Sequence, residues 1–366
     1  MSYAIDKLGS HPGALAAFRE GKPPGLITVH LMPQNLCNQR CSFCSYRLPD
    51  NKNSARFNEG AHIPWPAMAQ LLADFDQMGV QGVEVTGGGE PLAYPMTRQL
   101  WEEFSRYRFR TALVSNGTLL RPELAPVVTA ARLSWARISI DAASEEIYAE
   151  MRKCPRGHFR KAWAAVRLLR EHAPQDPDFR LGVGFVLCNE NMAEVYDFVR
   201  LASESGADNC RLSVTFSDQH EDFFRDKRSL AAAVEESERA VIDFHRPPAF
   251  VVNNLMPKRH WEVQHPAQDY VRCPSKDVLC VVEGECKVYT CCTFTGSVFG
   301  LYGKFTEHAS GFHGLWDDFS TWRSKFDASK YCQCSCLYRD RNLAMNALID
   351  GIGEPPAHDG VHREFI

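Results

Sequence analysis

The sequence lacks the features that would place the protein in a membrane or in a secretory pathway. None of its apolar runs reaches the ~20 residues that a membrane span requires. Its first residues, MSYAIDKLGSHPG, do not show the basic segment followed by an apolar segment that marks a signal peptide. We therefore expect a cytoplasmic protein that makes no contact with a membrane.

Strong charge and the common short catalytic motifs are also missing. The formal net charge is -4 over 366 residues, which gives no indication of nucleic acid as a partner. No GxxxxGK[ST] phosphate loop, HExxH zinc motif or RNA-binding motif occurs. What remains is the composition of an ordinary globular protein, long enough to bury a large core.

Cysteine is present in excess and is unevenly distributed. The sequence has 14 cysteines, with three of them between residues 37 and 44 and eight between residues 273 and 336. In a reducing compartment thiols stay free for metal ions instead of forming disulfides. The two groups therefore predict two metal sites.

Short β-rich runs alternate with helical stretches from residue 26 to about residue 255. This alternation is typical of a parallel sheet built from six or seven βα units. Strands are predicted at 26–33, 82–88, 111–117, 135–141, 180–188 and 209–216, and helices at 65–79, 96–107, 122–131, 159–173, 192–206 and 229–245. The pattern predicts three parts: a lead-in at 1–25, an α/β domain at 26–255 and a small cysteine-rich α+β domain at 256–366.

The first cysteine group follows directly on the first predicted strand, with the spacing CxxxCxxC at Cys37, Cys41 and Cys44. Active sites of parallel barrels lie at the carboxyl ends of the strands, where this loop begins. Three thiolates leave one iron of a four-iron cluster open to a small molecule. A structural zinc ion, completed by a distant His or Cys, is the alternative because it would require four protein ligands.

This spacing, with the aromatic Phe43 before the last cysteine, resembles the radical S-adenosylmethionine (SAM) superfamily. The resemblance covers residues 26 to 217, and further matches follow the next three strands in the family's order: Gly87, Gly88, Gly89 and Glu90, then Ser115 and Asn116, then Ser139 and Asp141. It implies a partial (βα)6 TIM-like barrel that binds SAM and a [4Fe-4S] cluster on the three cysteines. A reductant such as flavodoxin or ferredoxin is then an expected partner.

The matched residues suggest a cofactor pocket. A glycine run allows close approach of a ligand to the backbone, and Glu90 can accept a hydrogen bond from a cationic amine. In the family this motif holds the amino group of the methionine moiety. The short polar side chains after the third and fourth strands are placed to hold the ribose or carboxylate, unless they are only turn residues. Arg152 resembles the family's carboxylate partner, with a solvated helix arginine as the alternative.

The second cysteine group resembles the auxiliary-cluster extension called SPASM or, in a shorter form, twitch. Residues 281–292 are expected to form a two-stranded ribbon, and the later cysteines alternate along the chain. We expect one auxiliary [4Fe-4S] cluster, whose leading ligands are Cys273, Cys291, Cys334 and Cys336. Cys332 or Cys292 could replace one of them. A structural zinc ion is again the alternative.

The resemblance implies reductive cleavage of SAM to a 5'-deoxyadenosyl radical that abstracts hydrogen from a substrate. We expect a small polar substrate such as a sugar, aminocyclitol or nucleotide, which is dehydrogenated, epimerised or rearranged. A maturase of peptide or protein side chains is the alternative, although only about 25 residues precede the first strand. A third hypothesis is a non-catalytic iron-sulfur carrier. Cys188, at the end of the fifth predicted strand, is a candidate hydrogen-atom donor.

Overall fold

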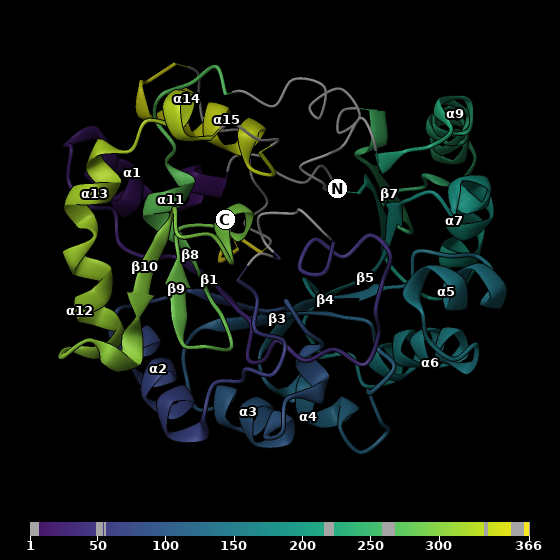
Figure 1. The fold of residues 1–366 in the computed structure, drawn as a ribbon, viewed down its shortest axis with the longest axis horizontal. Coiled ribbons are helices and arrows are strands. Elements are labelled where there is room, and N and C mark those ends of the chain that lie inside the picture. The colour runs from purple at the N-terminus through teal and green to yellow at the C-terminus, as the bar shows by residue number, and fades with distance from the viewer. Residues whose placement is uncertain are drawn as a thin grey trace.

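The computed structural model describes residues 7–48, 54, 56–215, 223–257, 268–332, 336–352 and 362–365. Within these residues ten strands form one sheet in the order β10-β9-β8-β1-β2-β3-β4-β5-β6-β7 (Figure 1). Seven successive strands pair in parallel: β1 (Thr28–Leu31), β2 (Gly82–Val85), β3 (Arg110–Ser115), β4 (Leu133–Ser139), β5 (Arg180–Leu187), β6 (Asn209–Val214) and β7 (Val251–Asn254). The predicted partial barrel is confirmed.

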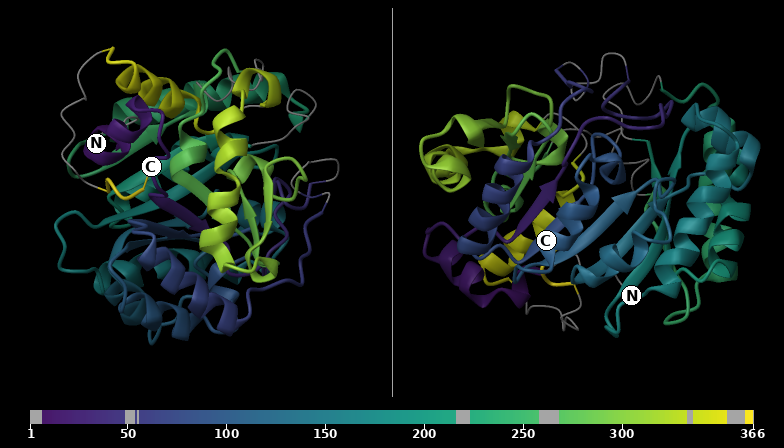
Figure 2. Two further views of the ribbon diagram at one scale, coloured as in Figure 1. Left: turned by 90° about the vertical axis from the view of Figure 1, so that its left-hand side faces the viewer. Right: turned by 90° about the horizontal axis from the view of Figure 1, so that it is seen from below.

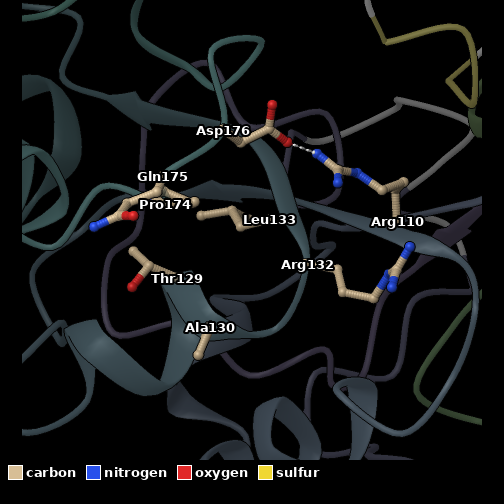
Figure 3. Close-up of a pocket in the computed structure, with 8 residues that line it drawn as sticks. All are labelled: Arg110, Thr129, Ala130, Arg132, Leu133, Pro174, Gln175 and Asp176. Atoms are coloured by element: carbon tan, nitrogen blue, oxygen red, sulfur yellow. Dashed lines mark hydrogen bonds and ion pairs between the residues drawn. The ribbon is translucent and has the colours of Figure 1, made fainter.

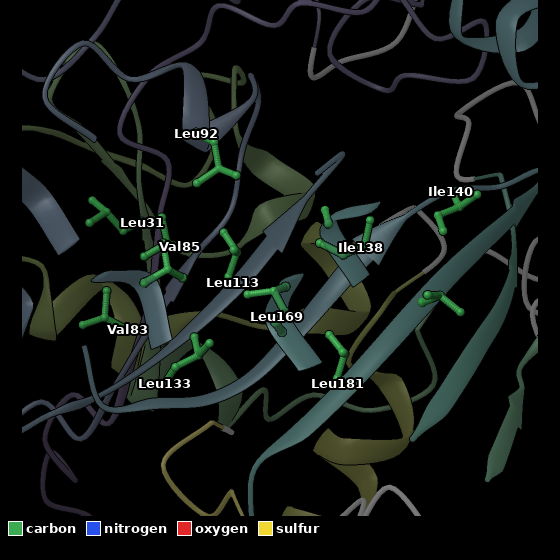
Figure 4. Close-up of a cluster of buried hydrophobic side chains, with 14 of the residues drawn as sticks. Leu31, Val83, Val85, Leu92, Leu113, Leu133, Ile138, Ile140, Leu169 and Leu181 are labelled. Atoms are coloured by element: carbon green, nitrogen blue, oxygen red, sulfur yellow. The ribbon is translucent and has the colours of Figure 1, made fainter. Parts of the chain in front are cut away.

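Helices between these strands surround the outer side of the sheet (Figure 1). They are α2 (Trp65–Gln77), α3 (Thr97–Phe104), α4 (Ala125–Ala130), α5 (Glu145–Arg152), α6 (Gly157–Glu171), α7 (Val195–Glu204) and α9 (Lys227–Phe244). Alternate strand residues point to opposite faces, and the apolar ones face the helices. Figure 4 shows this core, in which Leu113, Ile138 and Leu181 are fully buried.

The sequence prediction does not include β7 and α5. β7 has only four residues, and two of them are asparagines, which are depleted in strands. α5 is an eight-residue helix that begins where the Ser144 hydroxyl accepts a hydrogen bond from the Ile147 amide. Such short elements carry too little apolar periodicity to be recognised, and their position depends on the surrounding fold.

The C-terminal ribbon continues the sheet of the barrel instead of standing apart from it. β8 (Leu279–Val282) pairs in parallel with β1, while β9 (Lys287–Tyr289) and β10 (Leu301–Lys304) follow in antiparallel order. The helices of this region are α11 (Ser275–Val278), α12 (Gly311–Asp318), α13 (Ser320–Lys325), α14 (Ala328–Tyr331) and α15 (Arg339–Ile349). Short 3-10 turns occur at η1 (Lys7–Ser10), η2 (Pro91–Ala93), η3 (Met192–Glu194), η4 (Cys292–Phe294) and η5 (Phe305–Glu307).

The two ends of the chain lie close to the amino ends of the strands. The first helix, α1 (Pro12–Arg19), shares a small apolar core with α15 (Figure 2). The carbonyl of Glu364 accepts a hydrogen bond of 2.8 Å from the Thr28 hydroxyl, and the ring of Phe365 lies 5.7 Å from that of Trp135. The tail therefore covers the end of the barrel opposite the cysteine loop. None of the described helices is long and apolar enough to cross a membrane.

Candidate functional site

The structure brings together the three cysteines of the predicted cluster loop: Cys37, Cys41 and Cys44. The loop follows β1 and is fixed by backbone hydrogen bonds to the last turn of α5. The amide of Arg40 donates to the carbonyl of Arg152 at 3.0 Å, and the amide of Ser42 donates to the carbonyl of Met151 at 2.7 Å. The end of a helix leaves carbonyl groups without partners inside the helix, and this loop satisfies two of them.

Each of the three thiols has a nitrogen donor from another side chain nearby. Asn116 Nδ2 lies 4.0 Å from Cys37 Sγ, Arg152 Nη1 lies 3.9 Å from Cys41 Sγ, and Arg47 Nη1 lies 3.7 Å from Cys44 Sγ. Burial raises the pKa of Cys37 to about 11 and that of Cys41 to about 12. Thiolates in this loop therefore need a positive partner, and a metal cluster together with the two guanidinium groups would supply it.

A single metal ion and a four-iron cluster place different demands on the three cysteines. In the described part of the chain, no three His, Cys, Asp or Glu side chains are placed to bind one ion. A four-iron cluster does not require such close convergence, because each thiolate binds a different iron. Three thiolates leave the unique iron of such a cluster open to a further ligand, whereas a structural zinc ion would require a fourth protein ligand.

Glu90 connects the loops that follow the second and third strands. Its carboxylate is 2% exposed and accepts three hydrogen bonds: from the Leu92 amide at 3.0 Å, the Ser115 hydroxyl at 2.6 Å and the Asn116 amide at 2.8 Å. Burial raises the pKa of Glu90, while these donors favour its charged form. The structure thus brings Glu90, Ser115 and Asn116 together, and their binding of the cofactor stays a prediction.

The glycine run before Glu90 is needed for contact between two parts of the protein. A Cβ atom on Gly89 would overlap the backbone carbonyl of Leu36, which immediately precedes the cysteine loop. A Cβ atom on Gly88 would overlap the ring of Phe57. The glycines thus allow the loop after β2 to pack directly against the cluster loop.

Arg152 lies at the end of α5, where its side chain is buried between two loops. Its five N–H groups all have acceptors within the protein: the carbonyls of Ile140 and Ser139, the carboxylate of Asp141, the amide oxygen of Gln39 and the sulfur of Cys41. Asp141 adopts a left-handed conformation with φ of 63° and also accepts from the Val186 amide at 2.8 Å. A cofactor carboxylate would have to displace one of these acceptors to bind Arg152.

Sequence reasoning did not identify Gln39 and Arg47 as parts of this site. The amide oxygen of Gln39 accepts from Arg152 at 2.6 Å, and Arg47 donates to the carbonyl of Gly88 at 3.3 Å as well as contacting Cys44. Their positions within and directly after the cysteine motif could have identified them as parts of the site. Phe43 behaves as expected for an aromatic residue next to a cluster ligand, because it packs against the main core while partly exposed.

Residues 31–202 match the sequence profile of the Radical SAM superfamily. The chain contains a radical SAM domain. Enzymes of this family use SAM and a [4Fe-4S] cluster, and the geometry of the cysteine loop described above fits that cluster. The membership expected from the motif order is confirmed.

Two known proteins are similar to parts of this chain. The chain is 31% identical to the AdoMet-dependent heme synthase of Methanosarcina barkeri over 123 residues, and this stretch covers 34% of each of the two chains. Over 241 residues it is 24% identical to the PqqA peptide cyclase of Gluconobacter oxydans, covering 65% of this chain and 63% of that protein. The chain thus spans about one third of the first relative and less than two thirds of the second.

The fold also resembles solved structures at low sequence identity. A structure titled native anSMEcpe with bound AdoMet has a TM-score of 0.59 at 14% identity, covering 89% of this chain and 96% of that one. Streptococcus suis SuiB bound to the precursor peptide SuiA has a TM-score of 0.55 at 14% identity, covering 74% and 61%. These values establish the shared fold.

A second site lies in the C-terminal region, where four cysteines line one small pocket: Cys273, Cys291, Cys332 and Cys336. Three polar groups donate toward their sulfur atoms. Asn342 Nδ2 lies 3.4 Å from Cys273 Sγ, and the Tyr270 hydroxyl and Tyr338 amide lie 3.5 and 3.4 Å from Cys336 Sγ. Burial raises the pKa of Cys273 and Cys291. Hydrogen bonds of this kind tune the potential of iron-sulfur clusters.

The auxiliary ligand set predicted from the sequence agrees with this pocket only in part. Cys334, one of the leading ligands in the prediction, lies outside the described residues. Of the two substitutes, Cys332 lines the pocket. Cys292 is not among the residues that line the pocket; its sulfur lies 3.4 Å from the Tyr338 hydroxyl, and it packs against the apolar cluster of Met32, Val281 and Tyr289.

Two further features of the barrel are Cys188, at the carboxyl end of β5, and an open pocket at the opposite end of the strands. Cys188 is fully buried within the main core, directly after β5, so its role as a hydrogen donor stays a prediction. The open pocket is lined by Arg110, Arg132 and Asp176 among others, and it lies at the amino ends of β3 and β4 (Figure 3). Arg110 is already paired with Asp176 there.

Proposed function

We propose that this chain is a radical SAM enzyme that abstracts a hydrogen atom from a side chain of a peptide or protein. The observation that carries the proposal is the gathering of three thiols at the carboxyl ends of the parallel strands, beside the loops of Glu90 and Ser115. The relatives favour a peptide substrate over the small polar metabolite expected from the sequence. They include a peptide cyclase, a SuiB complex with its precursor peptide and an anSMEcpe complex with a peptide.

The residues of this chain would prepare the site for its cofactors. When bound, the cluster and SAM supply one-electron chemistry that yields a 5'-deoxyadenosyl radical able to abstract hydrogen from carbon. Arg152 and Arg47 would offset the negative charge of the thiolates, and the buried Glu90 holds two strand-end loops in a fixed relation.

The test uses anaerobically reconstituted enzyme treated with a strong reductant. We expect 5'-deoxyadenosine to form from SAM, and Cys41→Ala to abolish its formation because two thiolates cannot hold the cluster in the same geometry. Cys210→Ala, on β6 and outside both cysteine groups, is the matched control and should retain it. Undiminished cleavage in the Cys41→Ala variant would exclude this function.

We further propose one auxiliary [4Fe-4S] cluster in the C-terminal pocket and a flavodoxin or ferredoxin as the reductant. Iron analysis should give about eight irons per chain, which corresponds to two four-iron clusters. A variant with alanine at Cys37, Cys41 and Cys44 should retain about half of the iron. Finding zinc in that variant, or no metal, would contradict the auxiliary cluster.

Whether the reaction is an oxidation or an epimerisation depends on the fate of the substrate radical. An oxidation would give a product lighter by two hydrogens, with the auxiliary cluster as the electron acceptor. An epimerisation would require a hydrogen donor such as Cys188, whose thiyl radical would be returned to the thiol by one electron from the reductant and one proton from solvent. Its product would carry one deuterium when formed in deuterated water. Cys188→Ala should then block the product while SAM cleavage continues, and product formation at the normal rate would rule out this donor.

A further inference from the structure

A buried lysine lines the auxiliary pocket together with its four cysteines. Lys276 lies on α11, three residues after Cys273, and is only 7% exposed. Its ammonium group donates a hydrogen bond of 2.6 Å to the carboxylate of Asp277. A lysine is rarely buried without a compensating negative charge, because removal from water disfavours the charged form. The charges around Lys276 therefore indicate what kind of group the pocket can hold.

Asp277 is shared between two buried cations. Its Oδ2 accepts from Lys276, and its Oδ1 lies 3.7 Å from Nε of Arg323 on α13. Arg323 is 4% exposed; its Nη1 donates to the Trp316 carbonyl at 2.7 Å, and its Cζ lies 3.8 Å from the centroid of the Trp316 ring. A carbonyl and an aromatic ring favour a cation but carry no negative charge. This network of two cations and one carboxylate therefore has a surplus of one positive charge.

The positive charge of Lys276 acts on a thiol of the pocket. Burial raises the pKa of Cys273, whereas the charge of Lys276 and a hydrogen bond from the Lys276 backbone amide lower it, and the charge of Asp277 raises it. The fully buried Asn342 adds a second donor to the same sulfur at 3.4 Å. Lys276 thus favours the thiolate form of Cys273, which is the form that binds a metal.

We propose that Lys276 raises the reduction potential of a four-iron cluster in this pocket, so that the cluster is poised to accept an electron from the substrate radical. A cluster gains one negative charge when it is reduced, and a nearby buried cation stabilises the more negative form. Asp277 holds the ammonium group in place without cancelling the charge of the whole network. The inference rests on the proposed function and on the auxiliary cluster proposed with it.

This role belongs to the oxidative course of the proposed reaction. A hydrogen atom passes from a substrate carbon to the 5'-deoxyadenosyl radical, and the substrate radical then loses one electron to the oxidised auxiliary cluster and one proton to solvent. The product has two hydrogens fewer than the substrate. Oxidised flavodoxin or ferredoxin returns the reduced cluster to its starting state. A higher potential of the acceptor makes the transfer of this electron more favourable.

The test is a redox titration of the reconstituted holoenzyme, followed by electron paramagnetic resonance. The auxiliary signal is the one retained when Cys37, Cys41 and Cys44 are replaced by alanine. Lys276→Met removes the charge and keeps an unbranched side chain. It should lower the ratio of reduced to oxidised auxiliary cluster at a fixed potential by about tenfold or more, which corresponds to ~59 mV for one electron. Lys276→Arg should keep the ratio close to that of the wild type.

Two further variants distinguish a charge effect from a loss of packing. Asp277→Asn removes the carboxylate and leaves both cations, so it should raise the ratio instead of lowering it. Lys330→Met, on α14, is the matched control: Lys330 lies two residues before Cys332, but its side chain is 74% exposed. Water and salt screen such a charge, and the ratio should not change.

The outcomes separate this inference from the proposed function. An unchanged ratio in Lys276→Met, an equal change in Lys330→Met, or changes of the same sign in Lys276→Met and Asp277→Asn would overturn the inference. Iron content and near-ultraviolet circular dichroism show whether each variant is folded and loaded. If Lys276→Met loses its auxiliary cluster, Asp277→Asn decides, because an unchanged or lower ratio in that variant contradicts the charge effect. Formation of 5'-deoxyadenosine by a wild type that shows no auxiliary signal would overturn this inference and leave the cleavage of SAM standing.

Discussion

The guanidinium of Arg152 and the carboxylate of Asp141 form an ion pair whose side chains are only 4% and 2% exposed. Asp141 follows β4 and Arg152 ends α5, so the pair fixes the helix to the end of the strand. The same guanidinium reaches Gln39 and Cys41 in the cluster loop. One buried side chain therefore determines where the cluster ligands lie relative to the barrel.

Replacing Arg152 by leucine should destabilise the protein and release iron. Removal of one member of a buried pair leaves the other charge without a partner, which typically costs about 3–5 kcal/mol. We expect a lower denaturation midpoint and a loss of up to half of the iron. Arg160→Leu, which breaks an exposed pair with Glu145, is the control and should change little. Full iron content in the Arg152→Leu variant would contradict this role.

A methyl group at Gly89 should displace the cluster loop. The Cβ atom of Gly89→Ala would overlap the Leu36 carbonyl, and backbone atoms cannot move aside as the end of a flexible side chain can. We expect the initiating cluster to be lost while the auxiliary cluster remains, so that iron falls to about half. Gly157→Ala, where no atom lies within 4 Å, provides the comparison. Electron paramagnetic resonance of the reduced protein would show which cluster remains.

The sequence allowed the parallel strands and the order of the site loops to be predicted, because both depend on local patterns. The resemblance suggested a cofactor carboxylate as the partner of Arg152, and this stays a prediction; its contacts with Gln39 and Asp141 in two loops of this chain could not be read from the sequence. The pairing of β8 with β1 joins Leu279 to Thr28, which are far apart in sequence. No local periodicity could indicate such contacts.

The auxiliary cysteines show a second limit of sequence reasoning. If residues 332–336 were extended, the alternating cysteines would share one side. Cys332 instead lies at the end of α14, and Cys336 comes shortly before α15. Both still reach the same pocket, because helix packing brings the two ends together. The pocket therefore brings these two cysteines together, and the ligand set of the auxiliary cluster stays a prediction.

Docking of the C-terminal tail should weaken as the pH falls. Burial lowers the pKa of His362 to about 4, from the ordinary value of ~6.5. Between these two values the unfolded chain binds a proton at His362 more readily than the folded chain does. The contribution of neutral His362 to the free energy of unfolding is therefore complete above pH ~6.5 and is lost as the pH falls toward 4. The loss between pH 7.5 and 5.5 would be up to about 1.4 kcal/mol.

The corresponding measurement compares melting temperatures at pH 7.5 and 5.5 for the wild type and His362→Gln. Glutamine retains an N–H donor for the Asp178 carbonyl, which the His362 ring contacts at 2.8 Å, but it does not titrate. The variant should show a smaller difference between the two pH values. An equal difference in both proteins would mean that His362 does not control docking.

Single alanine variants can show which cysteines bind the auxiliary cluster. Cys332 lines the pocket with three other cysteines, while Cys292 contacts the Tyr338 hydroxyl and is not among the lining residues. If the pocket holds a four-iron cluster, Cys332→Ala should remove about four irons and Cys292→Ala should remove none. Cys334→Ala should be tested in the same series, because Cys334 is a predicted ligand that lies outside the described residues. Loss of iron from the Cys334 variant with full iron in the Cys332 variant would restore the ligand set expected from the sequence, and would show that the pocket rearranges when the cluster binds.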